Sequence, residues 1–385
     1  MNKIISRSFR KASPVIICLI LSIATAFSQD LSKIKITPTS RLLVDGATFS
    51  DENVDLTDGF AVRDFRLGLK AYYEQFYLKA DVSLVSNKVS LKDVYLQYNL
   101  NDNALVRGGH FTVPFGLQSA YGTAHKQFMA EPSSNVYQMG RRVGVMHSLW
   151  NDKFWLAYGA FADNKAITES TDVSGKQGYT IAERFVYKPI CREGELLQVG
   201  FSFAHVQAEA VGKDKPRTIT YKTAYLSAVD KTNAVNAVVD KARYENKWTV
   251  ELAGIYRNFV LESQYYSSNI KRTDAPSFKS DGFYAIAKGI VLNRADYKYS
   301  KSGAGIDSPS NKALEVALGY SLLDLNSSKT GIYGGKMQDV SVGLSFYWNK
   351  YVTIRGNYSY ITVKTTDDEP KKKVNAFQCR IQYYF

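Results

Sequence analysis

The chain has few of the residues that hold small secreted domains or metal centres together, since its 385 residues include 3 cysteines and 4 histidines. Cys18 lies near the N-terminus, Cys191 lies in a Pro-Ile-Cys-Arg segment, and Cys379 lies close to the C-terminus. We do not expect Cys191 and Cys379 to pair, and nothing in the spacing of Cys and His resembles a metal site. The sequence therefore argues against a disulfide scaffold and predicts no metal and no cofactor.

Long hydrophobic runs are also missing, apart from one over residues 15–26. Four basic residues precede this run, namely Lys3, Arg7, Arg10 and Lys11, and Ala26-Phe27-Ser28 closes it. This order predicts a secretory signal peptide over residues 1–28, because the run is shorter than the ~20 apolar residues of a spanning helix. A lipoprotein signal at Cys18 is the alternative, but Ile17 stands where a small residue is needed. We expect residues 29–385 to form the exported protein.

Proline is scarce and aromatic residues are plentiful, with 9 Pro against 27 Tyr and 20 Phe. Apolar and polar residues alternate in many segments, as in RDFRLGLKAYY, where Phe65, Leu67 and Leu69 share one face. Alternation of this kind is typical of β-strands. The mean hydropathy of −0.24 looks soluble, but a membrane barrel with a polar lumen and an apolar outer face gives the same average.

Sixteen segments show this alternation. They are 33–45, 60–73, 75–85, 90–100, 103–113, 140–150, 153–163, 178–188, 195–206, 247–257, 258–270, 280–292, 313–325, 338–349, 351–363 and 373–385. Each has about the ~9–11 residues of a tilted membrane-spanning strand, or slightly more. An even number of strands is what bacterial single-chain barrels have. The pattern predicts an all-β, transmembrane, antiparallel β-barrel of about 16 strands.

The connections between these segments differ at the two ends of the predicted barrel. Short turns such as Asn101-Asp102 and Asn349-Lys350 would face the periplasm, and long loops such as 114–139 and 207–246 would face outward. One long connection, 293–312, falls on the periplasmic side and breaks the rule. A soluble β-sandwich is the alternative, but its connections would have similar lengths at both ends. The asymmetry favours a barrel in the bacterial outer membrane.

The chain ends in NAFQCRIQYYF, an alternating strand whose last residue is Phe385. Termini tend to fray unless they are paired, so we expect this strand to close the barrel against the first one. A terminal alternating strand that ends in Phe resembles the recognition signal that the barrel assembly machinery reads. That resemblance implies the assembly machinery as a partner through Phe385.

The segment VRGGHFTVPFGLQSA at residues 106–120 carries a more specific pattern. Its residues Gly109, Phe111, Pro114, Phe115 and Gly116, followed by Gly140-Arg141-Arg142 and Gly144, resemble a motif of the phosphate-selective porin O and P family. Weaker matches run along most of the chain. In two places the chain departs from the family pattern, because Asp64 follows Arg63 and Thr112 stands between Phe111 and Pro114.

The resemblance implies a homotrimer of sixteen-stranded barrels that conducts small anions such as phosphate along a series of basic side chains. It also implies that the third extracellular loop, 114–139, folds into the lumen after a turn at Pro114, Phe115 and Gly116. His125 and Lys126 are then the basic residues nearest the constriction. Outer-membrane lipid and lipopolysaccharide are the expected surroundings.

The alternation also assigns side chains to the lumen. The inward cations are Arg41, Arg66, Lys70, Lys79, Arg142, Arg184, Arg355 and Arg380, and the inward acids are Asp64, Asp81, Asp93, Glu251, Glu262 and Glu315. Basic residues along a pore suit anions, so we predict an anion path along Arg41, Arg66, Lys70, Lys79, Lys126, Arg142, Arg184 and Arg355. The alternative is that inward cations and acids pair across neighbouring strands.

Three other functions are alternatives for a barrel of this kind. An outer-membrane enzyme needs a nucleophile and a base in contact, whereas the adjacent His147 and Ser148 project to opposite faces of a strand. An adhesive barrel would use the long 207–246 loop, and a non-selective porin would lack the anion preference. The run Lys371-Lys372-Lys373 suits lipopolysaccharide better than nucleic acid, which we do not expect as a partner.

Overall fold

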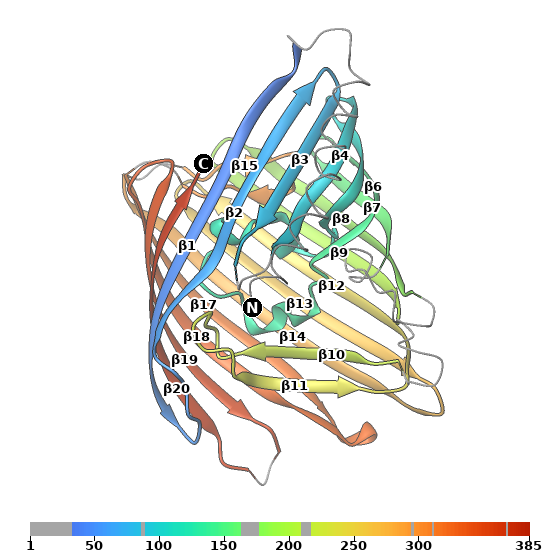
Figure 1. Ribbon diagram of the computed structural model, residues 1–385, viewed down its shortest axis with the longest axis vertical. Helices are drawn as coiled ribbons and strands as arrows, with labels where there is room; N and C mark the ends of the chain where they lie inside the picture. Colours follow the sequence, from blue (N-terminus) through green and yellow to red (C-terminus); the bar gives the residue numbers. More distant parts are fainter. Residues whose placement is uncertain are drawn as a thin grey trace, which may run out of the picture.

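The computed structural model describes residues 33–85, 89–162, 177–208, 217–293, 296–309, 312–366 and 369–385, so the expected signal peptide lies outside the described residues. Sixteen antiparallel strands form a closed barrel (Figure 1). In ring order they are β1 (Lys35–Glu52), β2 (Gly59–Tyr73), β3 (Phe76–Ser83), β4 (Ser90–Asn101), β5 (Ala104–Thr112), β6 (Arg141–Trp150), β7 (Phe154–Ala162), β8 (Tyr179–Arg192), β9 (Glu195–Gln207), β12 (Ala242–Tyr256), β13 (Phe259–Arg272), β14 (Ala275–Leu292), β17 (Ala313–Ser327), β18 (Ile332–Tyr347), β19 (Val352–Lys364) and β20 (Lys372–Tyr384). The predicted sixteen-stranded barrel is confirmed.

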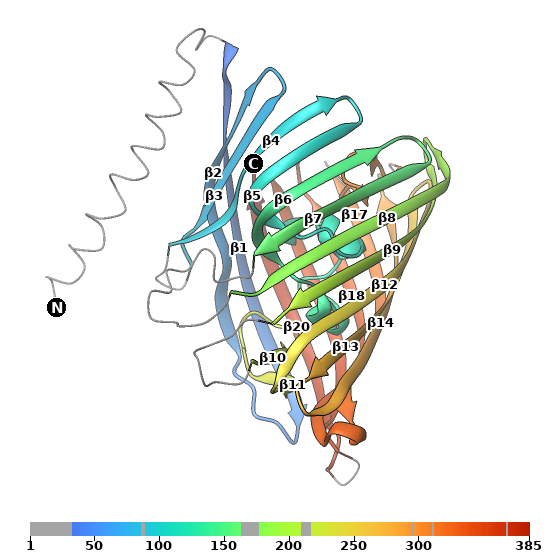
Figure 2. The same ribbon diagram turned by 90° about the vertical axis from the view of Figure 1, so that its right-hand side faces the viewer.

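The strands differ in length around the ring. Strands β3 to β7 have between 8 and 12 residues, whereas β14 has 18 and β18 has 16. Several long strands begin or end beyond the predicted ranges, as β14 does at Ala275. At these strand ends the backbone pairing continues through residues that are mostly polar. The alternation of apolar and polar residues therefore ends earlier in the sequence than the strand itself. Figure 2 shows β3 to β7 ending short of the lower edge that β1, β14 and β18 reach.

The first and last strands close the ring. β1 pairs with β20 from Arg41 opposite Tyr384 to Glu52 opposite Lys373. Next to the first of these pairs, Ser40 and Phe385 exchange two backbone hydrogen bonds of 3.0 Å. The terminal Phe385 is therefore held in the ladder, as the alternating C-terminal segment predicted.

The two faces of the sheet have opposite character. On β18, Val340, Val342 and Leu344 point outward and are exposed, while Ser341 and Ser345 point inward and are buried. The closed ring with an apolar outer face rules out the sandwich alternative. No helix in the described part of the chain has the length and hydropathy to span a membrane.

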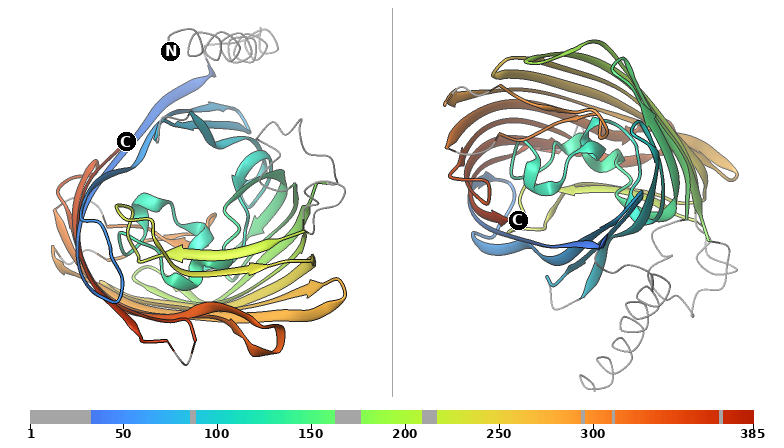
Figure 3. Two further views of the ribbon diagram at one scale, coloured as in Figure 1. Left: turned by 60° about the horizontal axis from the view of Figure 1, so that its bottom comes forward. Right: turned by 90° about the horizontal axis from the view of Figure 1, so that it is seen from above.

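Three segments fill the lumen (Figure 3). The first is the inward loop, residues 113–140, which crosses the ring with three short 3₁₀ helices: η2 (Leu117–Ala120), η3 (Thr123–His125) and η4 (Ser133–Tyr137). The second is the hairpin of β10 (Ile219–Ala224) and β11 (Asn233–Val239). The third is the small hairpin of β15 (Tyr299–Ser300) and β16 (Gly305–Ile306).

The β10–β11 hairpin corrects the expectation that 207–246 is an outward loop. Its Tyr221 hydroxyl lies 3.0 Å from the Ser268 hydroxyl on the inner wall, and the Gln378 amide donates to the Leu226 carbonyl at 3.0 Å. Residues such as Ala237 are fully buried. The hairpin folds inward because its apolar face finds cover against the inner loop and wall, so length alone did not indicate an external loop.

Candidate anion path in the lumen

The inward loop leaves the wall at the predicted turn. Val113 donates its backbone N–H to the Gly140 carbonyl at 3.0 Å, which closes the neck of the loop. Gly116 has φ 74° and ψ 166°, a backbone region that is essentially restricted to glycine. A Cβ at Gly116 would lie 2.0 Å from Nε2 of Gln264. Glycine is therefore required where the chain turns off β5 into the lumen, and the buried Phe115 ring fixes that turn next to Tyr266.

The loop is fastened to the far side of the ring by arginines. Arg355 donates to the carbonyl groups of Ala124, at 3.0 Å, and Lys126, and Arg380 donates to the Met129 carbonyl at 3.0 Å. The side chain of Arg355 is 2% exposed. The structure therefore places Arg355 beneath the loop as an anchor and not at an open surface.

Arg184 is buried in the same way. It is 1% exposed, and its guanidinium makes two hydrogen bonds to Glu251, at 3.0 and 2.7 Å. A third hydrogen bond reaches the Ala304 carbonyl at 2.8 Å, which holds the β15–β16 hairpin in the lumen. Arg184 therefore pairs with an inward acid, which is the alternative to an anion path that the sequence left open.

The two basic residues of the inward loop add little free charge. Lys126 is buried and forms an ion pair with Glu131 at 2.8 Å. Burial opposes the ionisation of Glu131, but Lys126 next to it lowers the pKa of that carboxyl overall. For His125, burial and then the nearby Arg355 and Arg41 lower the pKa to about 4, so the imidazole is neutral at neutral pH.

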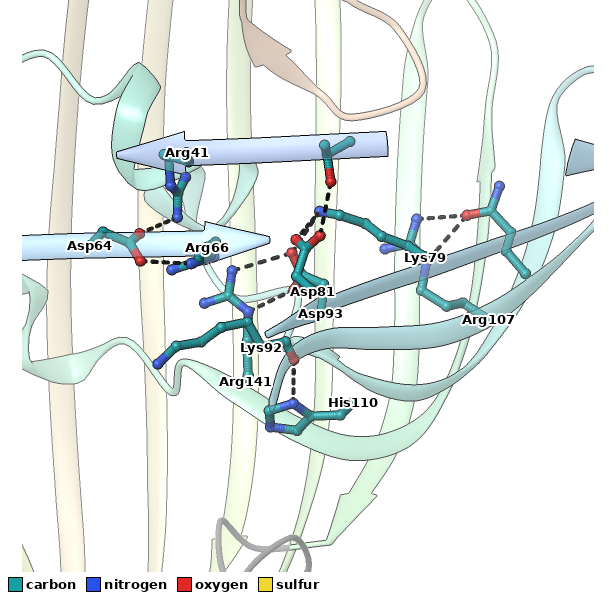
Figure 4. Close-up of polar contacts among 12 residues, drawn as sticks. Arg41, Asp64, Arg66, Lys79, Asp81, Lys92, Asp93, Arg107, His110 and Arg141 are labelled. Atoms are coloured by element: carbon teal, nitrogen blue, oxygen red, sulfur yellow. Dashed lines mark hydrogen bonds and ion pairs between the residues drawn. The ribbon is translucent and has the colours of Figure 1, made fainter. Parts of the chain in front are cut away.

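The arc of the wall from β1 to β6 carries a cluster of cations and aspartates that point toward one another (Figure 4). We call it the basic cluster, and it consists of Arg41, Arg66, Lys70, Lys79, Lys92 and Arg141. Three aspartates lie among these six cations, namely Asp64, Asp81 and Asp93. The formal charge of the cluster with its aspartates is therefore +3.

Ion pairs hold the basic cluster together. Asp64 bridges Arg41 at 2.5 Å and Arg66 at 2.9 Å. Asp93 bridges Lys79 at 2.7 Å and Arg141 at 2.6 Å. The side chains of Lys79 and Arg141 keep 22% and 26% of their surface exposed, whereas Arg41 and Arg66 are buried.

Like charges lie directly opposite each other in this arc. Arg41 is the cross-strand partner of Arg66, and Lys70 is the partner of Lys79. Like charges in such positions destabilise a sheet. An arrangement that costs stability and leaves a net positive charge next to open space is what a binding surface for anions requires.

Two cavities border the basic cluster. The small cavity, of about 110 Å³, is bordered by Arg41, Arg66, Lys70, Lys79 and Arg141 and by His125 of the inward loop. The large cavity, of about 460 Å³, is bordered by Arg63, Arg66, Lys92 and Lys231. Arg66 borders both cavities.

The sequence alternation did not assign Arg63, Lys92 or Arg141 to the lumen, and for Arg63 and Lys92 the reason is an irregular ladder. The register of β1 and β2 shifts beside Arg63, and that of β3 and β4 shifts beside Lys92. A β-bulge inserts one residue, so strict alternation no longer tells which side chain faces inward. Arg141 lies at the start of β6, where the predicted alternation assigned its neighbour Arg142 to the lumen instead. Arg142 itself is half-buried and borders neither cavity.

At Asp64 the chain departs from the family motif, and in the structure this carboxylate neutralises part of the charge of Arg41 and Arg66.

Within the described residues, no three His, Cys, Asp or Glu side chains gather as a metal site would require.

The family model described as phosphate-selective porin O and P matches residues 40–385 of the chain. Comparison of the sequence with curated proteins gives no match. Among solved structures, the chain is similar to an anion-selective porin from Comamonas acidovorans, with 14% identity and a TM-score of 0.58 over 91% of this chain and 100% of that one.

Two further solved structures are similar. One is the trimer form of OmpT, an outer membrane protein of Vibrio cholerae, with 13% identity and a TM-score of 0.58 over 91% of this chain and 99% of that one. The other is the outer membrane channel DcaP of Acinetobacter baumannii, with 12% identity and a TM-score of 0.58 over 92% of this chain and 98% of that one. These likenesses show the fold, and the match of the family model over nearly the whole barrel shows that the chain belongs to the phosphate-selective porin O and P family of outer-membrane porins.

Proposed function

We propose that this porin passes small hydrophilic solutes by diffusion and prefers anions, and that the basic cluster is the surface along which the anions move. The observation that carries the proposal is the asymmetry of the lumen. The segments inside the lumen cover the arginines of β8, β19 and β20. Four cations of the basic cluster instead keep part of their surface exposed beside the two cavities, and the cluster has a formal excess of three positive charges.

The mechanism is electrostatic attraction without bond formation. Arg and Lys side chains replace part of the hydration that an anion loses in a narrow pore. The planar donors of Arg41, Arg66 and Arg141 suit the oxygen atoms of phosphate. Asp64 and Asp93 weaken the attraction, which allows an anion to leave as well as enter. Arg66, which borders both cavities, is the residue at which an anion passes from one to the other.

The same proposal covers export and assembly. Residues 1–28 act as a cleaved signal peptide, residues 29–385 form the barrel, and the assembly machinery reads the strand that ends in Phe385. Three copies associate, as the trimer form of the Vibrio cholerae protein with the same fold suggests. Lys371–Lys373 meets lipopolysaccharide at the outer rim, where Lys373 also pairs with Glu52 at 2.9 Å.

We infer a channel and not an enzyme. Among the described residues, His125 is the histidine with a serine hydroxyl in reach, since its Nδ1 lies 3.2 Å from the Ser308 hydroxyl. With a pKa of about 4, caused by burial and the charges of Arg355 and Arg41, it is a poor base at neutral pH. A porin without charge preference is the second candidate, and the three aspartates of the basic cluster are the observation that favours it.

The test is single-channel recording of the purified protein in planar bilayers, with phosphate added to a chloride electrolyte. We expect a stable conductance that phosphate lowers, and a smaller effect of phosphate in the variant Arg66→Ala/Lys79→Ala. Arg192→Ala at the periplasmic rim removes one exposed cation and serves as the control. A conductance that phosphate leaves unchanged refutes phosphate recognition, and the absence of any conductance refutes the channel.

A further inference from the structure

The extracellular rim carries a cavity that is lined by cations outside the proposed anion path. It has a volume of about 390 Å³ and is lined by Arg217, Lys241, Ala242, Arg243, Thr273 and Asp274. It shares no lining residue with either cavity of the basic cluster. We call it the rim cavity.

Two backbone hydrogen bonds hold the walls of the rim cavity together. The N–H of Ala242 donates to the carbonyl of Arg217 at 2.9 Å, and the N–H of Thr273 donates to the carbonyl of Lys241 at 2.8 Å. The segment before β10, the start of β12 and the turn between β13 and β14 therefore meet at this point. Basic side chains that are distant in the sequence consequently border one cavity.

The charge of the rim cavity is not balanced. Its lining holds three cations and one acid, namely Arg217, Lys241, Arg243 and Asp274. The formal charge is therefore +2. Within the part of the chain that the structure describes, none of the three cations forms an ion pair. The nearby Asp240 does not compensate them, because Arg272 binds it. Cations held together in this way attract an anion from outside the protein.

The rim cavity lies where the barrel leaves the lipid. On β12, Val250 and Leu252 face outward and are exposed, and Trp248 follows them toward the extracellular end. Tyr244 lies further along the same outward face. Aromatic residues form a girdle at each membrane interface of such barrels. Arg243 directly precedes Tyr244 in the chain, so the rim cavity begins where the girdle ends.

Two lysines extend the positive charge over the neighbouring strands. Lys271 on β13 is the cross-strand partner of Tyr244, and Lys279 on β14 is the partner of Asn269. Both lysines are exposed. Together with Arg243 of β12, cations on three neighbouring strands therefore border the girdle, and this is the level of the lipid headgroups.

We propose that the rim cavity binds a phosphate group of lipopolysaccharide in the outer leaflet. Guanidinium donors suit phosphate oxygens, and each Lys or Arg beside an anionic membrane surface strengthens the attraction of its lipids. The occupant is a lipid and not a free anion because the cavity adjoins the girdle and is separate from the anion path. A bound lipid would also fasten the base of the β10–β11 hairpin, since Arg217 lies just before β10 and Lys241 just after β11.

The inference goes beyond the channel function and rests on the orientation in which the inward loop enters from the extracellular side. It also concerns a different place from the run Lys371–Lys373. That run lies at the start of β20, six strands away from β12 in the ring.

The test measures the dissociation constant of purified lipopolysaccharide for the full-length protein in detergent at low ionic strength. The variant Arg217→Gln/Lys241→Gln/Arg243→Gln removes the three cations of the rim cavity. The matched control, Lys153→Gln/Arg192→Gln/Lys350→Gln, removes the same charge from exposed residues of the periplasmic rim. With about fivefold in affinity for each cation, we expect binding to weaken about 100-fold in the variant. The control should bind as the unmodified protein does.

Two further probes identify the phosphate and need only the unmodified protein, so they hold even if the variant folds poorly. Lipopolysaccharide from which the phosphate groups have been removed should bind as weakly as the native lipid binds the variant. Millimolar inorganic phosphate should leave the native lipid bound, because the free ion lacks the acyl chains that lie against the girdle. Tight binding of the dephosphorylated lipid, displacement by inorganic phosphate, or equal losses in variant and control overturn the proposal.

Planar-bilayer recording of the same variant separates this proposal from the channel function. The rim cavity contributes no residue to the basic cluster, so the variant should keep the conductance and reversal potential of the unmodified protein. Loss of lipid binding with unchanged conductance supports the rim cavity as a lipid site. A variant that loses conductance while it still binds the lipid overturns the assignment of these cations to the lipid.

Discussion

If anions pass along the basic cluster, its acidic residue Asp93 should lower the preference of the pore for anions. Asp93 binds Lys79 at 2.7 Å and Arg141 at 2.6 Å, so Asp93→Asn removes one negative charge and leaves both cations without that carboxylate. Lys79 keeps its second partner, Asp81, at 3.2 Å. We therefore expect the barrel to fold and the formal charge of the cluster to rise by one unit.

The size of the effect follows from Coulomb's law. An ion that passes about 8 Å from one unit charge interacts with it by ~0.5 kcal/mol at the dielectric constant of water. Asp93→Asn therefore stabilises a passing anion by ~0.5 kcal/mol and destabilises a passing cation by the same ~0.5 kcal/mol. The ratio of anion to cation permeability then shifts by ~1 kcal/mol, which is about 5-fold. Salt screens this interaction, so the shift is largest in dilute electrolyte and nearly absent at about 1 M.

The assay is the reversal potential in a planar bilayer under a KCl gradient, at low and at high ionic strength. Asp93→Glu keeps the charge and is the matched control, with an expected ratio close to that of the unmodified protein. If Asp93→Asn leaves the permeability ratio unchanged in dilute salt, or moves it toward cations, then ions do not pass the basic cluster and the assignment of the path is wrong.

Three further predictions follow from the same contacts. Arg66→Ala removes the cation that borders both cavities and should lower the anion-to-cation permeability ratio by about 5-fold on the same Coulomb argument, whereas Arg192→Ala at the rim should leave the ratio unchanged in the same reversal-potential assay. Replacement of residues 297–308 by a short Gly-Ser turn empties the periplasmic end of the lumen and should raise single-channel conductance; an unchanged conductance would show that the narrowest section lies elsewhere. His125, whose pKa is lowered to about 4 by burial and by Arg355 and Arg41, binds fewer protons in the native state than in the unfolded state between pH 6.5 and 4. The thermal stability of the protein should therefore fall as the pH drops through that window, and His125→Gln should reduce this loss in thermal melts followed by circular dichroism.

The sequence predicted the barrel well because the alternation of apolar and polar residues is a direct consequence of having lipid outside and water inside. NAFQCRIQYYF is an example, since its alternate residues and its terminal Phe385 anticipated the pairing of β20 with β1. The inward loop was also anticipated, although by family resemblance and not by physical derivation from the residues.

The details of the candidate site were less predictable. Arg63 and Lys92 stand beside irregularities of the strand register, which no periodic pattern reveals. Arg184 and Arg355 have the inward side predicted for them, but segments distant in sequence cover them and accept their hydrogen bonds. Which inward cation stays exposed depends on where the three lumen segments settle, and that is a property of the assembled tertiary structure.

The central claim is that the open part of the lumen is positively charged along β1 to β6. The measurement that tests it most directly is the reversal potential of the unmodified protein in a planar bilayer that separates concentrated from dilute KCl. We expect a potential whose sign shows that chloride is more permeant than potassium. A potential of the opposite sign, or one of zero, would contradict it.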